Sequence, residues 1–100
     1  MEYLSREQII NQLQQSFQTY LHQFGLDDIG VFEEQGQGNQ YYLGYTAKKG
    51  DKTYHIHTPF MKNNNGELAP LNHNWTVETD EPDRKDHSGY QNVESALRDI

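Results

Sequence analysis

The clearest pattern lies in the first quarter of the chain, where apolar residues recur every three or four positions. They form one stripe of an α-helix, made of Ile9, Ile10, Leu13, Phe17, Tyr20, Leu21 and Phe24. Ser5 and Gln8 have the spacing of a capping box, which satisfies free N–H groups where a helix begins. Gly25 is suited to the left-handed conformation that ends a helix. The pattern therefore predicts a helix over residues 6–24.

From residue 27 onward the apolar period changes to two, which is typical of half-buried strands. Strands are predicted over residues 28–35, 40–48 and 52–60, with glycine-containing turns between them. A two-residue turn at Gly50 and Asp51 gives the second hairpin a single register. Its facing pairs are Tyr41 and Phe60, Leu43 and Thr58, Tyr45 and Ile56, and Ala47 and Tyr54. These pairs share one face, which we expect to pack under the helix.

The register of the first strand has two alternatives. A symmetric loop over residues 36–39 places Phe32 beside Leu43 on the core face and turns Ile29 and Val31 outward. A one-residue bulge near the glycines reverses this assignment. The pattern alone leaves both registers open.

The second half of the chain has a weaker pattern. A long loop is predicted over residues 61–72, where Pro70 excludes regular structure. A fourth strand is predicted over residues 73–79, with Trp75 and Val77 on one face. Residues 78–87 are acidic, contain Pro82 and have no apolar residue, so we expect a solvated, mobile loop. The alternative for this run is a calcium site, which we do not favour because the glycine and spacing of an EF-hand are missing. A short C-terminal helix is predicted from the spacing of Tyr90, Val93, Leu97 and Ile100, with Ser88 or Asn92 as its cap.

Together these elements predict the α+β class. We expect a single domain over residues 1–100, with an N-terminal helix packed on a four-stranded antiparallel meander and a short C-terminal helix.

The composition and charge of the chain narrow the range of functions that it can have. The chain has 100 residues, of which 33% are hydrophobic, with seven Tyr among its aromatics, enough for a modest core. With no Cys, it has no disulfides or thiolate chemistry. A net charge of -7 opposes nucleic-acid binding. No apolar run is long enough for a membrane span, and the start lacks the pattern of a secretory signal, so we expect a cytoplasmic protein. Catalytic and nucleotide motifs are absent, so we expect neither an enzyme nor a cofactor.

The most specific chemical feature is a pair of histidines two residues apart. On a strand, His55 and His57 point to the same face, about 6.5–7 Å apart. Such pairs bind zinc or iron when a third ligand is present. The symmetric register of the first strand supplies Glu33, and His73 is the alternative if the fourth strand pairs alongside. The competing interpretation, which we favour, is that both are ordinary solvent-facing strand residues.

The polar side of the predicted helix is rich in amides. Gln8, Gln12, Gln15 and Gln23 run close to one stripe. An uncharged amide surface loses its water more easily than one of Glu and Lys, so it is a candidate surface for a protein partner or a second copy of the chain. The alternative is a solvated face made of good helix formers.

The chain resembles short uncharacterised cytosolic proteins of spore-forming Gram-positive bacteria. The resemblance rests on the Gln-rich opening helix, the strand containing residues 54–57, and the closing residues 89–97. Such families have no known function, so the resemblance implies no activity or site. A helix followed by a four-stranded meander also resembles cystatin-like and secretion-chaperone-like domains, which are mostly binding modules.

These observations favour a non-enzymatic protein-binding or regulatory module, whose partner is another protein or itself. The alternative is a small ligand- or metal-binding domain that uses the exposed sheet face around His55 and His57.

Overall fold

The computed structural model describes residues 2–80 and 86–100. The elements in chain order are α1 (Arg6–Gln14), α2 (Phe17–Gln23), β1 (Asp28–Gln35), β2 (Gln40–Lys49), β3 (Lys52–Lys62), β4 (Leu68–Pro70), β5 (Trp75–Thr79), β6 (His87–Tyr90) and α3 (Val93–Arg98). The strands form an antiparallel sheet in the order β1-β2-β3-β5-β6, and β4 also pairs with β3. The predicted α+β class is confirmed: helices lie at both ends of the chain, and the strands between them form an antiparallel sheet.

In the described residues the sheet has six strands, so the prediction of a four-stranded meander is wrong in this detail. The additional strand β4 lies inside the predicted loop over residues 61–72. It forms because Asn63 Oδ1 accepts hydrogen bonds from the N–H groups of Asn65 and Glu67, at 3.0 and 2.9 Å, which folds the chain back onto β3. Pro70 ends β4 and is exposed, where its missing N–H costs nothing. The other additional strand, β6, pairs with β5.

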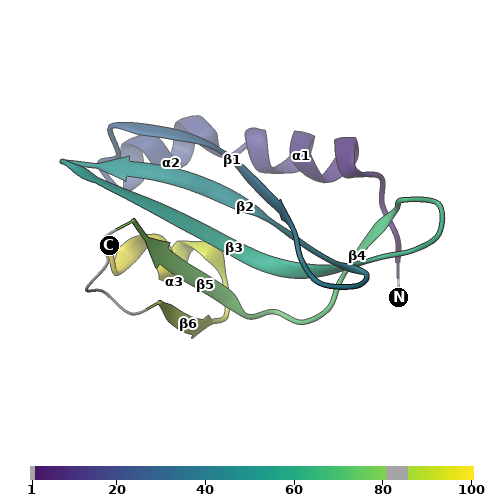
Figure 1. Ribbon diagram of the computed structural model, residues 1–100. Helices are drawn as coiled ribbons and strands as arrows, with labels where there is room; N and C mark the ends of the chain where they lie inside the picture. Colours follow the sequence, from purple (N-terminus) through teal and green to yellow (C-terminus); the bar gives the residue numbers. More distant parts are fainter. Residues whose placement is uncertain (1, 81–85) are drawn as a thin grey trace.

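The helices α1, α2 and α3 pack against the same face of the sheet. The larger core cluster joins Tyr20 of α2 and Leu97 of α3 to Tyr45, Ile56 and Val77 of the sheet. A smaller cluster lies under α1. The opposite face carries no helix in the described residues, and Figure 1 looks onto that open face, with the helices behind it.

The predicted helix over residues 6–24 is divided in two. Its ends agree with the prediction, since the Ser5–Gln8 capping box is present and Gly25 has a φ of +62°. Between them the helix breaks after Gln14 and resumes at Phe17. The prediction of a single uninterrupted helix is therefore wrong, and the cause is a contact between the Leu13 carbonyl and Tyr45 of the sheet.

The first hairpin has the bulged type of register, and the symmetric alternative is wrong. The N–H of Gly36 donates to the carbonyl of Gln40 at 2.9 Å, which shortens the loop to three residues. Ile29 and Val31 consequently lie opposite Ala47 and Tyr45 on the core face, and Phe32 is on the open face. The second hairpin has the predicted register in all four pairs.

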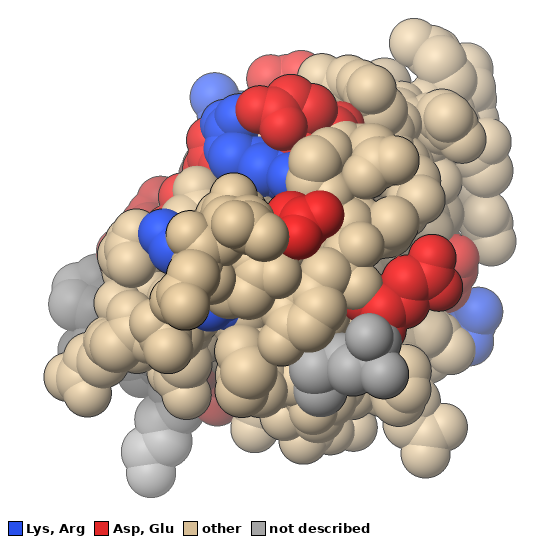
Figure 2. Space-filling view, turned by 90° about the vertical axis from the view of Figure 1, so that its right-hand side faces the viewer, with Lys and Arg blue, Asp and Glu red and all other residues tan. Residues whose placement is uncertain are grey.

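The C-terminal helix is shorter than its apolar spacing predicts. Asn92 is its cap, and the Asn92 side chain accepts a hydrogen bond from the N–H of Ser95 at 2.8 Å. Tyr90 belongs to β6 instead of the helix. None of the helices in the described residues is long and apolar enough to cross a membrane. Figure 2 shows the end of the molecule near α1 and β4, where acidic and basic side chains form small separate groups in a mostly uncharged surface.

Candidate functional site

His55 and His57 lie on β3 and face the open side of the sheet, as their spacing predicts. Phe32 packs against both imidazoles, with ring centroids 5.0 Å from His55 and 5.2 Å from His57. Phe32 reaches His57 across β2 because the residue between them, Gly44, has no side chain. His57 is only 7% exposed, so the expectation that both histidines face solvent is wrong for His57.

Carboxylates near the end of β5 hold the two imidazoles. Glu78 Oε1 lies 2.8 Å from His57 Nε2, and Asp80 Oδ1 lies 3.3 Å from His55 Nε2. The other nitrogen of His55, Nδ1, lies 3.0 Å from the hydroxyl of Thr46. Because a carboxylate accepts hydrogen bonds, the Nε2 of His57 carries the proton of its bond to Glu78.

Sequence reasoning missed these carboxylates because it placed them in a solvated acidic loop. A usable signal was present. The alternation of Trp75 and Val77 on one face turns Glu78 to the other, and pairing with β3 brings that face next to the histidines. Half of the predicted mobile loop over residues 78–87, together with most of the calcium alternative, lies at residues 81–85, outside the described residues. Of the remaining residues, Glu78 and Thr79 belong to β5 and His87 to β6, so the loop prediction is wrong for these three.

The structure does not bring Glu33 to the histidines. In the bulged register Glu33 lies opposite Leu43, and its carboxylate accepts hydrogen bonds from Arg6 Nε at 2.6 Å and from the Tyr41 hydroxyl at 2.7 Å. These bonds, above all that from Arg6, lower the pKa of Glu33. His73 is exposed and precedes β5, so it does not join the pair either. Within the described ranges, no three His, Asp or Glu side chains are arranged to hold a metal ion.

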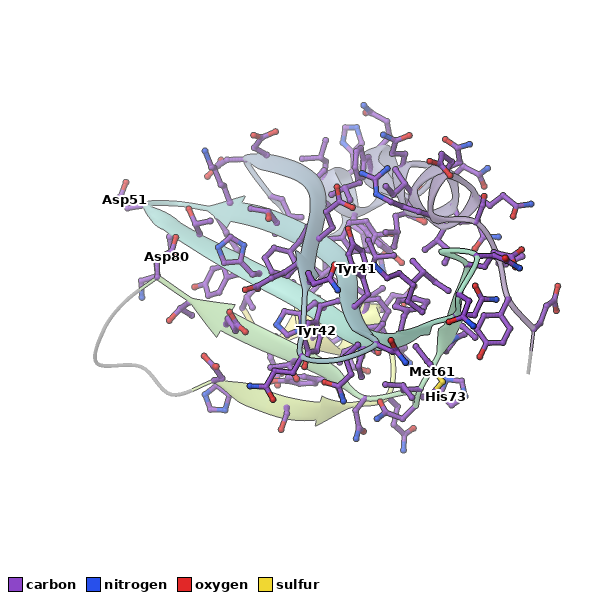
Figure 3. The ribbon with its side chains drawn as sticks, turned by 45° about the vertical axis from the view of Figure 1, so that its right-hand side comes forward. Tyr41, Tyr42, Asp51, Met61, His73 and Asp80 are labelled. Atoms are coloured by element: carbon purple, nitrogen blue, oxygen red, sulfur yellow. The ribbon has the colours of Figure 1, made fainter. Side chains whose placement is uncertain are left out.

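A groove of about 600 Å³ opens on the open face beside His57. Tyr41 and Tyr42 are neighbours on β2, and their side chains point to opposite faces of the sheet (Figure 3). Tyr42 lines the groove and packs edge-on against the His57 ring at 5.3 Å. The other lining residues come from the end of β1, the β1–β2 loop, the start of β2 and β5, and they include Glu34, Gln35, Gln37, Gln40, Thr76 and Glu78.

The chemistry of the groove is set by one nitrogen and two carboxylates. His57 Nδ1 is buried and has no hydrogen-bond partner among the described residues. In the neutral imidazole that donates from Nε2 to Glu78, Nδ1 is left as an acceptor. Of the described residues that line the groove, Glu34 and Glu78 are acidic and none is Lys or Arg. The groove therefore offers acceptors and negative charge to a ligand.

The amide-rich helix face is only partly continuous. Gln8, Gln12, Gln15 and Gln23 are all exposed, as predicted. The break after α1 separates Gln23 from the others, and the side chain of Gln8 is used in the capping box. Gln12 differs from the rest because it lines two hollows between α1 and the sheet.

These features define a class of protein: a small α+β domain with its helices on one face of an antiparallel sheet and a polar, histidine-lined groove on the other. The chain belongs to DUF5634, a family of unknown function whose model matches residues 3–100. This agrees with the predicted resemblance to a family without known function. No curated protein matches the chain.

Proposed function

We propose that the protein is a non-enzymatic binding module whose site is the groove beside His57 on the open sheet face. The observation that carries the proposal is the imidazole of His57. It is more than nine-tenths buried, and its Nδ1 has no partner among the described residues. A buried polar atom without a partner costs free energy, and a ligand that donates a hydrogen bond to it removes that cost.

The charge of the groove selects the ligand. Glu34 and Glu78 attract a cation, the overall charge of -7 adds to that attraction, and the ring of Tyr42 offers a π face to the same group. A protonated amine or a guanidinium satisfies all three conditions and also donates an N–H to His57. The ligand class we propose is therefore a small amine or guanidinium compound, or the Lys or Arg side chain of a partner protein.

Two other candidate sites, a zinc site at the histidine pair and the amide-rich helix face, have less support than the groove. A metal ion bound through the Nε2 atoms of both histidines must displace the carboxylates beside them, and the structure does not bring Glu33 or His73 to the pair. The amide face has no comparable unsatisfied group, although it remains a candidate surface for a protein partner. We therefore place the binding function on the open sheet face.

The test is a titration followed by NMR amide shifts and calorimetry. We expect agmatine, which carries both an amine and a guanidinium, to bind saturably and to shift the signals of Tyr42, His57 and Glu78. Glutarate, an anion of similar length, should not bind. A short arginine-containing peptide, added in a third titration, separates a small-molecule ligand from a protein side chain.

The diagnostic variant is Glu78→Gln, which keeps an acceptor for His57 and removes the charge. A lost charge-assisted bond should weaken agmatine binding about tenfold. Glu7→Gln is the matched control, because Glu7 is exposed on α1 against the opposite face, and it should bind as the parent does. The absence of saturable binding by both cationic probes, or an equal loss in the two variants, contradicts the proposal.

A further inference from the structure

The helix-covered face contains a feature that the proposed function does not use. The core is divided into two clusters, a larger one under α2 and α3 and a smaller one of Ile9, Leu43, Phe60 and Leu68 under α1. Leu13 packs against both. Protein interiors are close-packed and have few voids larger than a water molecule, so an apolar hollow beside the smaller cluster needs an explanation.

An apolar cavity of about 260 Å³ lies at the smaller cluster and is open to solvent. Its walls include Leu13, Leu43, Phe60 and Trp75, and among the described lining residues only Gln12 is polar. Water against such walls has few polar partners. An apolar cavity of about 150 Å³ is already large enough to take a benzene ring. This cavity therefore has room for a somewhat larger apolar body.

The cavity leads to a polar mouth. Gln12 also lines an adjoining groove of about 550 Å³, together with Glu2 and His73. The amide of Gln12 and the imidazole of His73 supply hydrogen bonds at this entrance, and Glu2 disfavours a negatively charged group. A matching ligand has an apolar body for the cavity and an uncharged polar head for the mouth.

We propose that this cavity is a second binding site, and that it takes a small uncharged amphiphile with a body of about six to eight carbons. The ligand enters between α1 and β4, at the mostly uncharged end of the molecule shown in Figure 2. Its body fills the cavity at the smaller core cluster, and its hydroxyl or amide head bonds to Gln12. The site is on the other face of the sheet from the groove beside His57, so the two proposals stand separately.

The chain contains its own reporter for this site. Trp75 is the only Trp in the sequence and lines the cavity, so a ligand in the cavity changes the emission of one known side chain. We expect 1-octanol to give a saturable change in Trp75 fluorescence. Octanoate, which has the same length and a negative head, should bind at least about tenfold more weakly because of Glu2.

Two matched variants locate the binding. Gln12→Phe adds bulk at the mouth from an exposed helix position, so the fold should persist and the 1-octanol affinity should fall about tenfold or more. Gln14→Phe adds the same side chain at an exposed position of α1 outside the described cavity lining, and its affinity should equal that of the parent. Circular dichroism verifies that both variants are folded.

Several results would overturn the proposal. They are an emission change that does not saturate, equal binding by the two variants, or octanoate binding as tightly as 1-octanol. A concentration-dependent molecular mass without 1-octanol binding would show instead that this end of the molecule is covered by a second copy of the chain.

Discussion

The hydroxyl of Tyr45 donates a hydrogen bond of 2.9 Å to the backbone carbonyl of Leu13. In an uninterrupted helix that carbonyl accepts from the N–H of Phe17, four residues on. Here the Leu13 carbonyl receives the Tyr45 hydroxyl and the N–H of Ser16, the latter at 3.2 Å. A side chain of the sheet thus occupies the acceptor that would continue α1, and the helix restarts as α2.

Replacing Tyr45 by Phe tests this contact. Tyr45→Phe keeps the ring, which packs edge-on against Phe17 at 6.0 Å and Tyr20 at 5.5 Å. The variant loses only the hydroxyl, so we expect the free energy of unfolding to fall by about 1 kcal/mol in a denaturant titration. An unchanged stability would mean that Ser16 alone satisfies the carbonyl.

The same residue predicts a pH dependence. Burial raises the pKa of Tyr45 to about 12, from an ordinary value near 10. The folded state therefore binds this proton more tightly than the unfolded state. Its contribution to stability is complete below pH 10 and is lost as the pH rises from 10 towards 12. Unfolding curves across that range should fall less steeply for Tyr45→Phe than for the parent, and equal slopes would contradict the assignment.

At Gly44, the addition of a single methyl group should strongly lower the stability of the fold. A Cβ built on Gly44 would lie 1.9 Å from the carbonyl oxygen of Ile56, a backbone atom that cannot move aside. Gly44→Ala should therefore cost about 3 kcal/mol or unfold the domain. Gly30→Ala is the matched control on the neighbouring strand, because nothing lies within 4 Å of its Cβ position. That variant should stay within about 1 kcal/mol of the parent.

How much of the fold the sequence predicts depends on the range of the interactions involved. The capping box, the Gly25 helix end and the second hairpin are set by residues close together in the chain, and all were predictable. The break between α1 and α2 was not, because Tyr45, which causes it, lies some thirty residues away. A helix stripe shows which face is buried, but it gives no sign that a distant hydroxyl will take one carbonyl.

In the candidate site, too, the features set by residues close together in the chain were predictable and those set by distant residues were not. The shared face of His55 and His57 follows from their spacing alone. Their partners Glu78 and Asp80 depend on which strand pairs with β3, and Glu33 was misplaced because a shift of one residue moves a side chain to the other face. The unsatisfied Nδ1 of His57 and the apolar cavity exist only in the packed structure.

Phe17 should be important for the stability of the packed helix face. It is partly buried against the larger core cluster and lies beside Tyr45. Phe17→Ala should lower the free energy of unfolding by about 3 kcal/mol, the lower end of the range for buried Phe. Gln18→Ala changes an exposed neighbour on the same helix and should have little effect. Similar melting curves for the two variants would show that α2 contributes little to the core.

The last prediction concerns Glu33, whose carboxylate joins α1 to the first hairpin. Hydrogen bonds from Arg6 and Tyr41 hold the pKa of Glu33 below its ordinary value of 4.5. The folded state therefore binds this proton more weakly than the unfolded state does. The associated stability is complete above pH 4.5 and is lost as the pH falls through the folded pKa. An NMR titration of the Glu33 carboxyl carbon measures that pKa directly. Arg6→Gln should raise it more than Tyr41→Phe does, because the bond from Arg6 is the largest cause of the shift. A Glu33 that titrates at the same pH in the parent and in Arg6→Gln would show that this contact does not persist in solution.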